Sequence, residues 1–232
     1  IIHQLFPCLQ AWEKLMDDSA DRQAELPTDF VPIDQTLLLG SAVDEYAKEP
    51  VLYQQMMELA MEAEESVILL SPYFTLDRFM KQSLQDLYED TPELLIVTNS
   101  MAMGNNIITM AENVICGTPA NTLKGAVFES QMAQSLHTKA MLLDGAVTLI
   151  GSFNFDMRSA YIDTEIMLYL RSDALCHAMM AYADDLIAES YAANEEAKAT
   201  GLGQSVAAAV PFGKRMITLI LSPLAALFRF LI

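Results

Sequence analysis

The sequence predicts an α/β sandwich in which a central, mixed and mostly parallel sheet is flanked by helices. Two short apolar runs, residues 66–70 (SVILL) and 94–98 (LLIVT), are typical of buried strands. Segments with helical periodicity lie between and after these runs, and strands that alternate with helices characterise α/β folds. The composition is 53% hydrophobic and 19% charged, so 232 residues are enough to form a substantial core.

The first 40 residues are expected to precede the main domain. Apolar residues three and four apart predict an amphipathic helix over residues 1–16, and two prolines among acidic residues predict a linker over 17–32. The chain begins without Met, and its first residues resemble the interior of a protein. We therefore expect residues 1–40 to be the end of a preceding half, missing here, and its linker.

Residues 41–198 are expected to form the main domain. A long helix over 41–65 starts or kinks at Pro50, and Asp77 is placed to cap the next helix. The dipeptide Asp144-Gly145 predicts a tight hairpin turn. Together the patterns predict further helices at residues 77–89, 106–116 and 172–198, and further strands at 125–129, 136–143, 147–150 and 164–170.

Residues 199–232 are expected to be a flexible segment followed by an apolar tail. The apolar part, residues 216–232, follows Lys214 and Arg215, contains Pro223, and is shorter than the roughly 20 residues that span a bilayer. Three interpretations stay open: a helix that packs on a missing part of the protein, an interfacial membrane anchor, and a transmembrane span.

Charge and cysteine content argue against several classes of protein. The net charge is −18, and residues 200–232 contain three basic residues and no acid, so the rest of the chain carries −21. Such a body repels the nucleic-acid backbone, and we therefore expect no nucleic-acid partner. The three cysteines, Cys8, Cys116 and Cys176, form no CxxC or Cys/His cluster, which argues against disulfides and structural zinc.

One constellation carries chemistry. His137 and Lys139 alternate on a predicted strand, so both side chains should point to one face. Ser152 and Asn154, two residues apart after the hairpin, can present a hydroxyl and a carboxamide on one face. An imidazole beside an ammonium group suits attack on an anionic phosphodiester, because the cation stabilises charge that develops on the phosphoryl oxygens. No metal or cofactor is implied, since one histidine beside a lysine makes a poor metal site.

These residues resemble the signature of the phospholipase D superfamily. Its two parts, HxKxxxxD and G[SG]xNxDxRS, match residues 137–144 and 151–159 at every fixed position. The resemblance implies that His137 is the nucleophile, forming a phosphohistidine, or the acid that protonates the leaving alcohol. It also implies that Lys139, Ser152 and Asn154 bind the phosphate.

The other polar residues of the signature are expected to support the site. Asp144 belongs to the catalytic motif, but the turn should place it away from the His/Lys face, where it shapes the hairpin. Asp156 is expected to organise local hydrogen bonds, and Arg158 to pair with a nearby carboxylate. The family often has Asn-x-Glu after this segment, where the acid orients a histidine across the site. Here Asp replaces the Asn, and Glu165 is the matching acid.

Family enzymes use two such motifs, whereas this chain has one. Either a preceding half or a second chain would complete the site. The segments SPYF (71–74) and TNS (98–100) resemble the start of the second half of bacterial cardiolipin synthases, and the likeness extends over residues 52–198.

The resemblance therefore implies a phosphatidyltransferase acting on phospholipids through a phosphohistidine. It also implies a peripheral location on the cytoplasmic side of a bacterial membrane, reached through the C-terminal tail. The alternatives are a phospholipase D-type hydrolase, a dimeric nuclease of the same superfamily, and an inactive isolated half-module.

Overall fold

The computed structural model describes residues 31–41, 48–104 and 106–228. The chain divides into two units, residues 1–32 and 33–232, and the description below concerns the second. The helix expected over residues 1–16 and nearly all of the expected linker lie outside the described residues.

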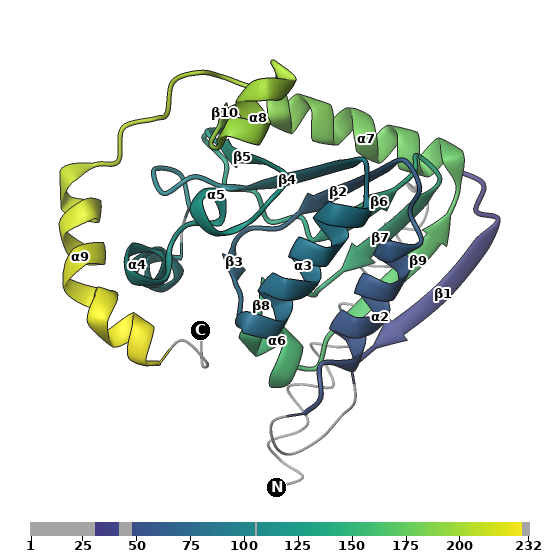
Figure 1. Cartoon of the computed structure of the whole chain (residues 1–232), viewed down its shortest axis with the longest axis horizontal. Coiled ribbons are helices and arrows are strands. Elements are labelled where there is room, and N and C mark those ends of the chain that lie inside the picture. The colour runs from purple at the N-terminus through teal and green to yellow at the C-terminus, as the bar shows by residue number, and fades with distance from the viewer. Residues whose placement is uncertain (1–30, 42–47, 105, 229–232) are drawn as a thin grey trace, which may run out of the picture. The chain divides into compact units, whose positions relative to one another are not determined.

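Within the described residues, eight strands form one mixed sheet (Figure 1). In spatial order they are β1 (Gln35–Gly40), β9 (Ile166–Arg171), β7 (Val147–Gly151), β6 (Ala140–Leu143), β2 (Ser66–Leu70), β4 (Glu93–Asn99), β5 (Ala126–Ser130) and β10 (Ser190–Ala192). Two further short strands, β3 (Phe74–Thr75) and β8 (Phe155–Asp156), pair with each other in parallel. The described helices are α2 (Val51–Met61), α3 (Arg78–Asp90), α4 (Ile107–Cys116), α5 (Pro119–Thr122), α6 (Met157–Tyr161), α7 (Asp173–Ala188), α8 (Glu195–Thr200) and α9 (Phe212–Leu227).

The mixed α/β sheet is confirmed, but the expectation that it is mostly parallel is wrong. Parallel pairing joins β2 to β4 and β4 to β5, where helices connect the strands. The remaining neighbours in the described sheet pair antiparallel. The physical reason is the tight hairpin between β6 and β7, because short connections can only join antiparallel strands.

The core is divided by the sheet into two layers. Successive residues of β2 alternate between them: Val67 and Leu69 face the layer under α2 and α3, whereas Ile68 and Leu70 face the layer under α7. This alternation follows from the two-residue period of a strand, and burial on both faces explains the continuous apolar run SVILL.

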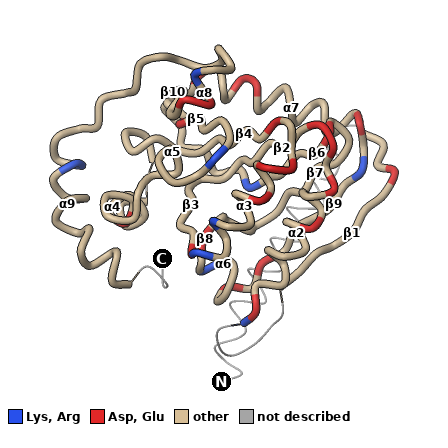
Figure 2. Tube along the Cα trace, viewed as in Figure 1, with Lys and Arg blue, Asp and Glu red and all other residues tan. Residues whose placement is uncertain are grey.

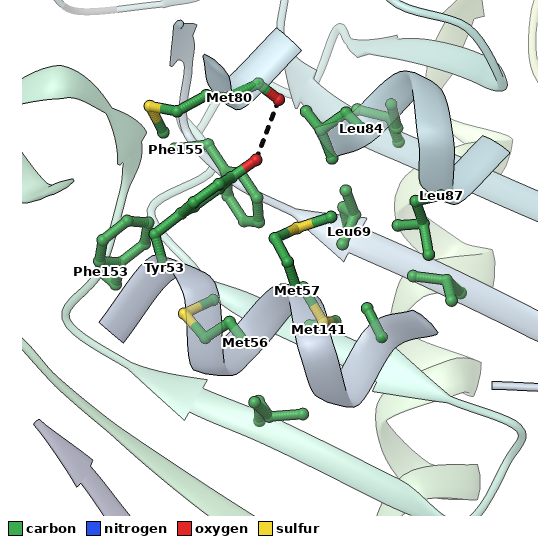
Figure 3. Close-up of a cluster of buried hydrophobic side chains, with 14 of the residues drawn as sticks. Tyr53, Met56, Met57, Leu69, Met80, Leu84, Leu87, Met141, Phe153 and Phe155 are labelled. Atoms are coloured by element: carbon green, nitrogen blue, oxygen red, sulfur yellow. Dashed lines mark hydrogen bonds between the residues drawn. The ribbon is translucent and has the colours of Figure 1, made fainter. Parts of the chain in front are cut away.

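An aromatic cluster occupies the end of the first layer nearest the signature residues. Figure 3 shows Tyr53 of α2 next to Phe153 and Phe155, and the Tyr53 hydroxyl donates a hydrogen bond to the Met80 carbonyl at 3.0 Å. The ring centroid of Tyr53 lies 6.2 Å from that of Phe153 and 6.3 Å from that of Phe155. Buried rings of this kind contribute both area and specific geometry, so they fix the course of the chain that carries them.

Both expected domain boundaries need correction. β1 pairs with β9, so residues 35–40 belong to the sheet and not to a preceding linker. At the other end, Ala192 N donates to Gln204 O, and α9 packs on α4, so the tail is part of the same unit. The boundary expected at residue 198 falls inside α8.

Two expected elements also differ. The helix predicted over 41–65 begins after Pro50, and residues 42–47 lie outside the described part of the chain. The helix predicted over 172–198 ends at Ala188, because the chain turns into edge strand β10 before α8 begins.

Charge is unevenly distributed over this unit. Figure 2 shows acidic positions along α2 and α7, whereas the marked residues of α9 are basic.

Candidate active site

His137 lies on an extended segment that leads into β6, not on the strand itself as the sequence predicted. Its position is fixed by hydrogen bonds between the preceding residue, Leu136, and Asn99, the last residue of β4. The Asn99 carboxamide accepts a hydrogen bond from Leu136 N at 2.8 Å and donates to Leu136 O at 2.9 Å and Pro72 O at 3.0 Å. Both backbone groups of the residue before His137 are therefore bonded to one side chain.

Lys139 and His137 do come together, as their spacing predicted. The Lys139 ammonium donates to the His137 carbonyl at 2.8 Å and lies 3.2 Å from Nδ1 and 3.4 Å from Nε2 of the imidazole. Lys139 is buried while His137 is exposed. Burial lowers the pKa of Lys139, and the charges of Glu165 and Asp156 oppose that shift. The result is a cation held against an accessible imidazole.

The second part of the signature is anchored by its aromatic residues. Phe153 and Phe155 enter the core, so the alternating Ser152 and Asn154 side chains leave the core on the other side of the segment. Ser152 is exposed, and its hydroxyl accepts from Ile166 N at 3.1 Å. The Asn154 Oδ1 atom is buried without a hydrogen-bond partner among the described residues. A polar atom left in this way is costly unless a ligand meets it.

Two buried carboxyl groups lie behind these residues and share Ser159. Asp156 accepts from Ser159 N at 2.6 Å, which caps α6, while Glu165 accepts from the Ser159 hydroxyl at 3.1 Å. Burial raises the pKa of Asp156 to about 6, and the hydrogen bonds from Ser159 only partly offset this. In the described residues the hydrogen bond of the Glu165 carboxylate goes to Ser159 and not to His137. Its expected role, to orient a histidine across the site, stays a prediction.

Asp144 and Arg158 lie outside this group. Asp144 follows the far end of β6, so the strand separates it from Lys139 by roughly 16 Å. Its carboxylate accepts from the backbone N–H groups of residues 64, 65 and 66, each at 2.9 Å. Arg158 is exposed and pairs with Asp163 through Nε at 2.9 Å. These contacts tie Asp144 to the start of β2 and Arg158 to a nearby carboxylate. The roles expected for both residues in the function of the site stay predictions.

His137 stands between two hollows. The larger, which we call the main pocket, has a volume of about 550 Å³. It is lined by residues 72–73 after β2, by the end of β4, by α4 and by residues 134–137. The second, of about 460 Å³, is bordered by His137, Lys139, Ile150 and Tyr182. The imidazole can therefore be reached from either side by a ligand of phospholipid headgroup size.

Sequence reasoning missed two residues of this pocket. Tyr73 lines its wall, and desolvation raises its pKa, with the Asp156 charge acting in the same direction. Asn99 holds the His137 segment, as described above. Asn99 ends buried strand β4, and Tyr73 lies three residues after buried strand β2. Polar residues at the strand ends of α/β folds meet at one edge of the sheet, and that position was the signal available. No group of three or more His, Cys, Asp or Glu side chains suited to a metal ion occurs among residues 31–41, 48–104 and 106–228.

The α/β fold and the joined HxK and GSxN segments define a phospholipase D-like domain. Residues 56–187 match the family described as "Cardiolipin synthase, PLD-like domain", and the chain belongs to this family. The match spans the His137, Lys139, Ser152, Asn154 and Glu165 positions.

The chain is similar in sequence to a cardiolipin synthase and in fold to two further proteins of known structure. The chain is 27% identical to cardiolipin synthase A of Serratia proteamaculans over 147 residues, which is 63% of this chain and 29% of that protein. It is similar in fold to phosphatidylserine synthase of Haemophilus influenzae (TM-score 0.59, 12% identity, 85% of this chain and 48% of that one). It is also similar to Nuc of Salmonella typhimurium (TM-score 0.51, 17% identity, 68% of this chain and 97% of that one). The chain thus spans less than a third of the curated synthase that it matches.

Proposed function

We propose that this chain is the C-terminal half of a phosphatidyltransferase that resembles cardiolipin synthase and acts on phospholipid phosphodiesters. The observation that carries the proposal is the accessible His137 imidazole, 3.2 Å from the Lys139 ammonium, at the wall of a pocket of about 550 Å³. The sequence match to cardiolipin synthase A supports the lipid assignment.

The chemistry requires a nucleophile and an acid. In one assignment an imidazole nitrogen of His137 attacks phosphorus, the bond from phosphorus to the leaving alcohol oxygen breaks, and a second histidine donates a proton to that oxygen. The hydroxyl of the acceptor lipid then attacks the phosphohistidine, His137 leaves, and the hydroxyl proton returns to the second histidine. In the other assignment the two histidines exchange roles, and His137 donates the proton.

The remaining groups stabilise the charge on the phosphoryl oxygens. Lys139 provides a positive charge that needs no reorganisation, because its hydrogen bond to the His137 carbonyl already fixes it. Ser152 and Asn154 provide a hydroxyl and a carboxamide on the same side of their segment. The second histidine would come from a preceding half or from a second chain, in keeping with a chain that covers 29% of its synthase relative.

A phosphodiesterase acting on nucleic acid is the second candidate. The fold likeness to Nuc and to NucT of Helicobacter pylori, over 97% and 99% of those chains, favours it. The net charge of −18 counts against it, since backbone binding normally depends on a basic surface. Water in place of the acceptor lipid would make the same site a phospholipase.

A turnover assay separates these outcomes. The chain alone and the full-length polypeptide that carries it are incubated with phosphatidylglycerol and phosphatidylethanolamine, and products are followed by mass spectrometry. We expect cardiolipin from the full-length polypeptide, loss of it in His137→Ala, and its retention in His177→Ala, a histidine outside the motif. Phosphatidic acid alone would indicate a hydrolase, and cleavage of DNA without any lipid product would overturn the proposal. Activity restricted to the longer polypeptide would identify the isolated chain as an inactive half.

A further inference from the structure

Helix α9 turns small and polar residues toward the protein and apolar residues outward, which is the reverse of an ordinary surface helix. The side that packs in the protein is formed by Thr218, Ser222 and Ala225, all buried. The opposite side is apolar and open, with Ile220 71% and Leu227 74% exposed. A helix of a soluble domain normally turns its apolar stripe inward, so the outward stripe of α9 indicates a partner that is not water.

Helix α4, on which α9 packs, also exposes apolar side chains. Ile108 and Ile115 of α4 are about half exposed, while its acidic residue, Glu112, is buried. We call the combined face the α4–α9 surface, formed by the exposed side chains Ile108, Val114, Ile115, Phe212, Met216, Ile217, Leu219, Ile220, Leu224, Leu227 and Phe228. This group is large compared with the scattered apolar residues found on most monomers.

The charge of this face is opposite to that of the rest of the chain. The described part of α9 carries Lys214 and Arg215 and no acid, whereas the chain as a whole has a net charge of −18. Figure 2 shows the same contrast between α9 and the acidic positions on α2 and α7. An apolar face with basic residues at one end is the pattern of a helix that binds an anionic lipid surface.

The α4–α9 surface also adjoins the main pocket. The Lys214 ammonium donates to Ala102 O at 2.9 Å and to Gly104 O at 2.7 Å. That loop and α4 contribute Met101, Gly104 and Asn106 to the pocket wall. A surface that rests on lipid would thus bring the pocket close to the headgroups.

We propose that the α4–α9 surface docks on an anionic phospholipid bilayer, with α9 lying in the interface and the main pocket opening beside it. No helix among the described residues is long and apolar enough to cross a membrane. The 16 residues of α9 extend about 24 Å, less than the hydrocarbon thickness of roughly 30 Å, which fits a helix parallel to the bilayer. This inference deepens the proposed function by assigning the surface through which a lipid substrate would be reached.

Vesicle binding tests the docking surface without any turnover. The chain is sedimented with vesicles of phosphatidylglycerol mixed with phosphatidylcholine, and with vesicles of phosphatidylcholine alone. We expect binding to the vesicles that contain phosphatidylglycerol. Ile220→Glu should weaken this binding roughly tenfold, because the aliphatic side chain that would insert into the bilayer is lost. Arg215→Gln should weaken it about fivefold, because a positive charge near the anionic headgroups is lost. Leu38→Glu is the matched control, because Leu38 is 66% exposed on β1 and lies outside the α4–α9 surface. This variant should bind vesicles as the unaltered chain does.

Several results would overturn the inference. These are no binding to either vesicle, equal binding to both, or equal weakening by Ile220→Glu and Leu38→Glu. A dimer detected by light scattering that Ile220→Glu dissociates, without vesicle binding, would show that a second copy covers the surface instead. The His137→Ala variant should bind vesicles normally, so failure of the catalytic proposal and failure of the docking proposal remain distinguishable.

Discussion

Replacing Asp144 tests whether the last residue of the HxKxxxxD motif acts in folding or in chemistry. Its carboxylate accepts three backbone hydrogen bonds, from residues 64, 65 and 66, and its backbone is in the left-handed region with φ +50°. Hydrogen bonds to charged groups are worth roughly 1.5–3 kcal/mol each when buried, and partial exposure reduces this to about 1 kcal/mol each here. Asp144→Ala should therefore lower the free energy of unfolding by about 3 kcal/mol, with up to roughly 1 kcal/mol more from the strained φ.

Thermal and urea unfolding measure this loss directly. For a domain of this size we expect a fall in Tm of about 6–12 °C for Asp144→Ala, and a smaller fall for Asp144→Asn, because asparagine tolerates this conformation and keeps an oxygen acceptor. Asp184→Ala, an exposed carboxylate on α7, is the control and should change Tm little. Desolvation raises the pKa of Asp144, but the three amide hydrogen bonds outweigh it and hold the pKa below its usual value. The stabilisation should thus be complete above about pH 4 and be lost as the pH falls through the folded-state pKa.

Two results would refute this reasoning. Equal Tm values for Asp144→Ala and Asp184→Ala would show that the hydrogen bonds contribute nothing. Loss of turnover in Asp144→Asn at unchanged Tm would place the carboxylate in the chemistry instead.

Three further predictions concern the surroundings of the site. Burial raises the pKa of Asp156 to about 6, so protonated Asp156 should stabilise the fold below about pH 4, and this stabilisation should be lost as the pH rises through 6. The variant Asp156→Asn keeps the helix cap and should reduce this dependence of Tm on pH. An unchanged dependence of Tm on pH would contradict the pKa assignment. Asn99→Ala removes the side chain that holds both backbone groups of Leu136, and it should reduce turnover roughly 10- to 100-fold because His137 is then misplaced. An unaltered NMR spectrum of the imidazole together with unaltered turnover would disprove this. The exposed Arg158–Asp163 pair should show a coupling energy below about 1 kcal/mol in a double-mutant cycle, and a larger value would mean that the pair organises the site.

The sequence predicted the strands that are buried on both faces and the helices that begin at a capping residue. β2 and β4 are continuous apolar runs, and Asp77 accepts a hydrogen bond from the first turn of α3 as expected. Asn106, the first residue of the helix predicted at 106–116, caps α4 in the same way. These features depend on local pattern, which is why one sequence is enough to find them.

Elements that depend on tertiary pairing were missed. β1 is largely exposed, so its leucines show no alternation between a core face and a solvent face, and only its pairing with β9 defines it as a strand. β10 interrupts residues with high helix propensity because Ser190, Tyr191 and Ala192 pair with the edge of β5. A local signal for that break existed in Asn194, which precedes two glutamates and caps α8.

The candidate site was predicted by residue type and corrected in geometry. The pairing of His137 with Lys139 followed from their spacing, but the segment that carries them is extended coil held by Asn99, a contact between positions far apart in the sequence. No spacing rule predicts such a contact, since only the fold brings the end of β4 to this segment.

The aromatic anchoring of the signature has a consequence for changing the substrate that the proposed function assigns to this site. Phe153 and Phe155 are packed against Tyr53 in the core, so substitutions of these residues lower the stability of the fold. The main pocket is not lined by these rings, and one of its walls is formed by α4 and the loop that Lys214 holds. Directed evolution toward a new headgroup or acceptor should therefore succeed through substitutions in that wall and fail through substitutions around Phe153.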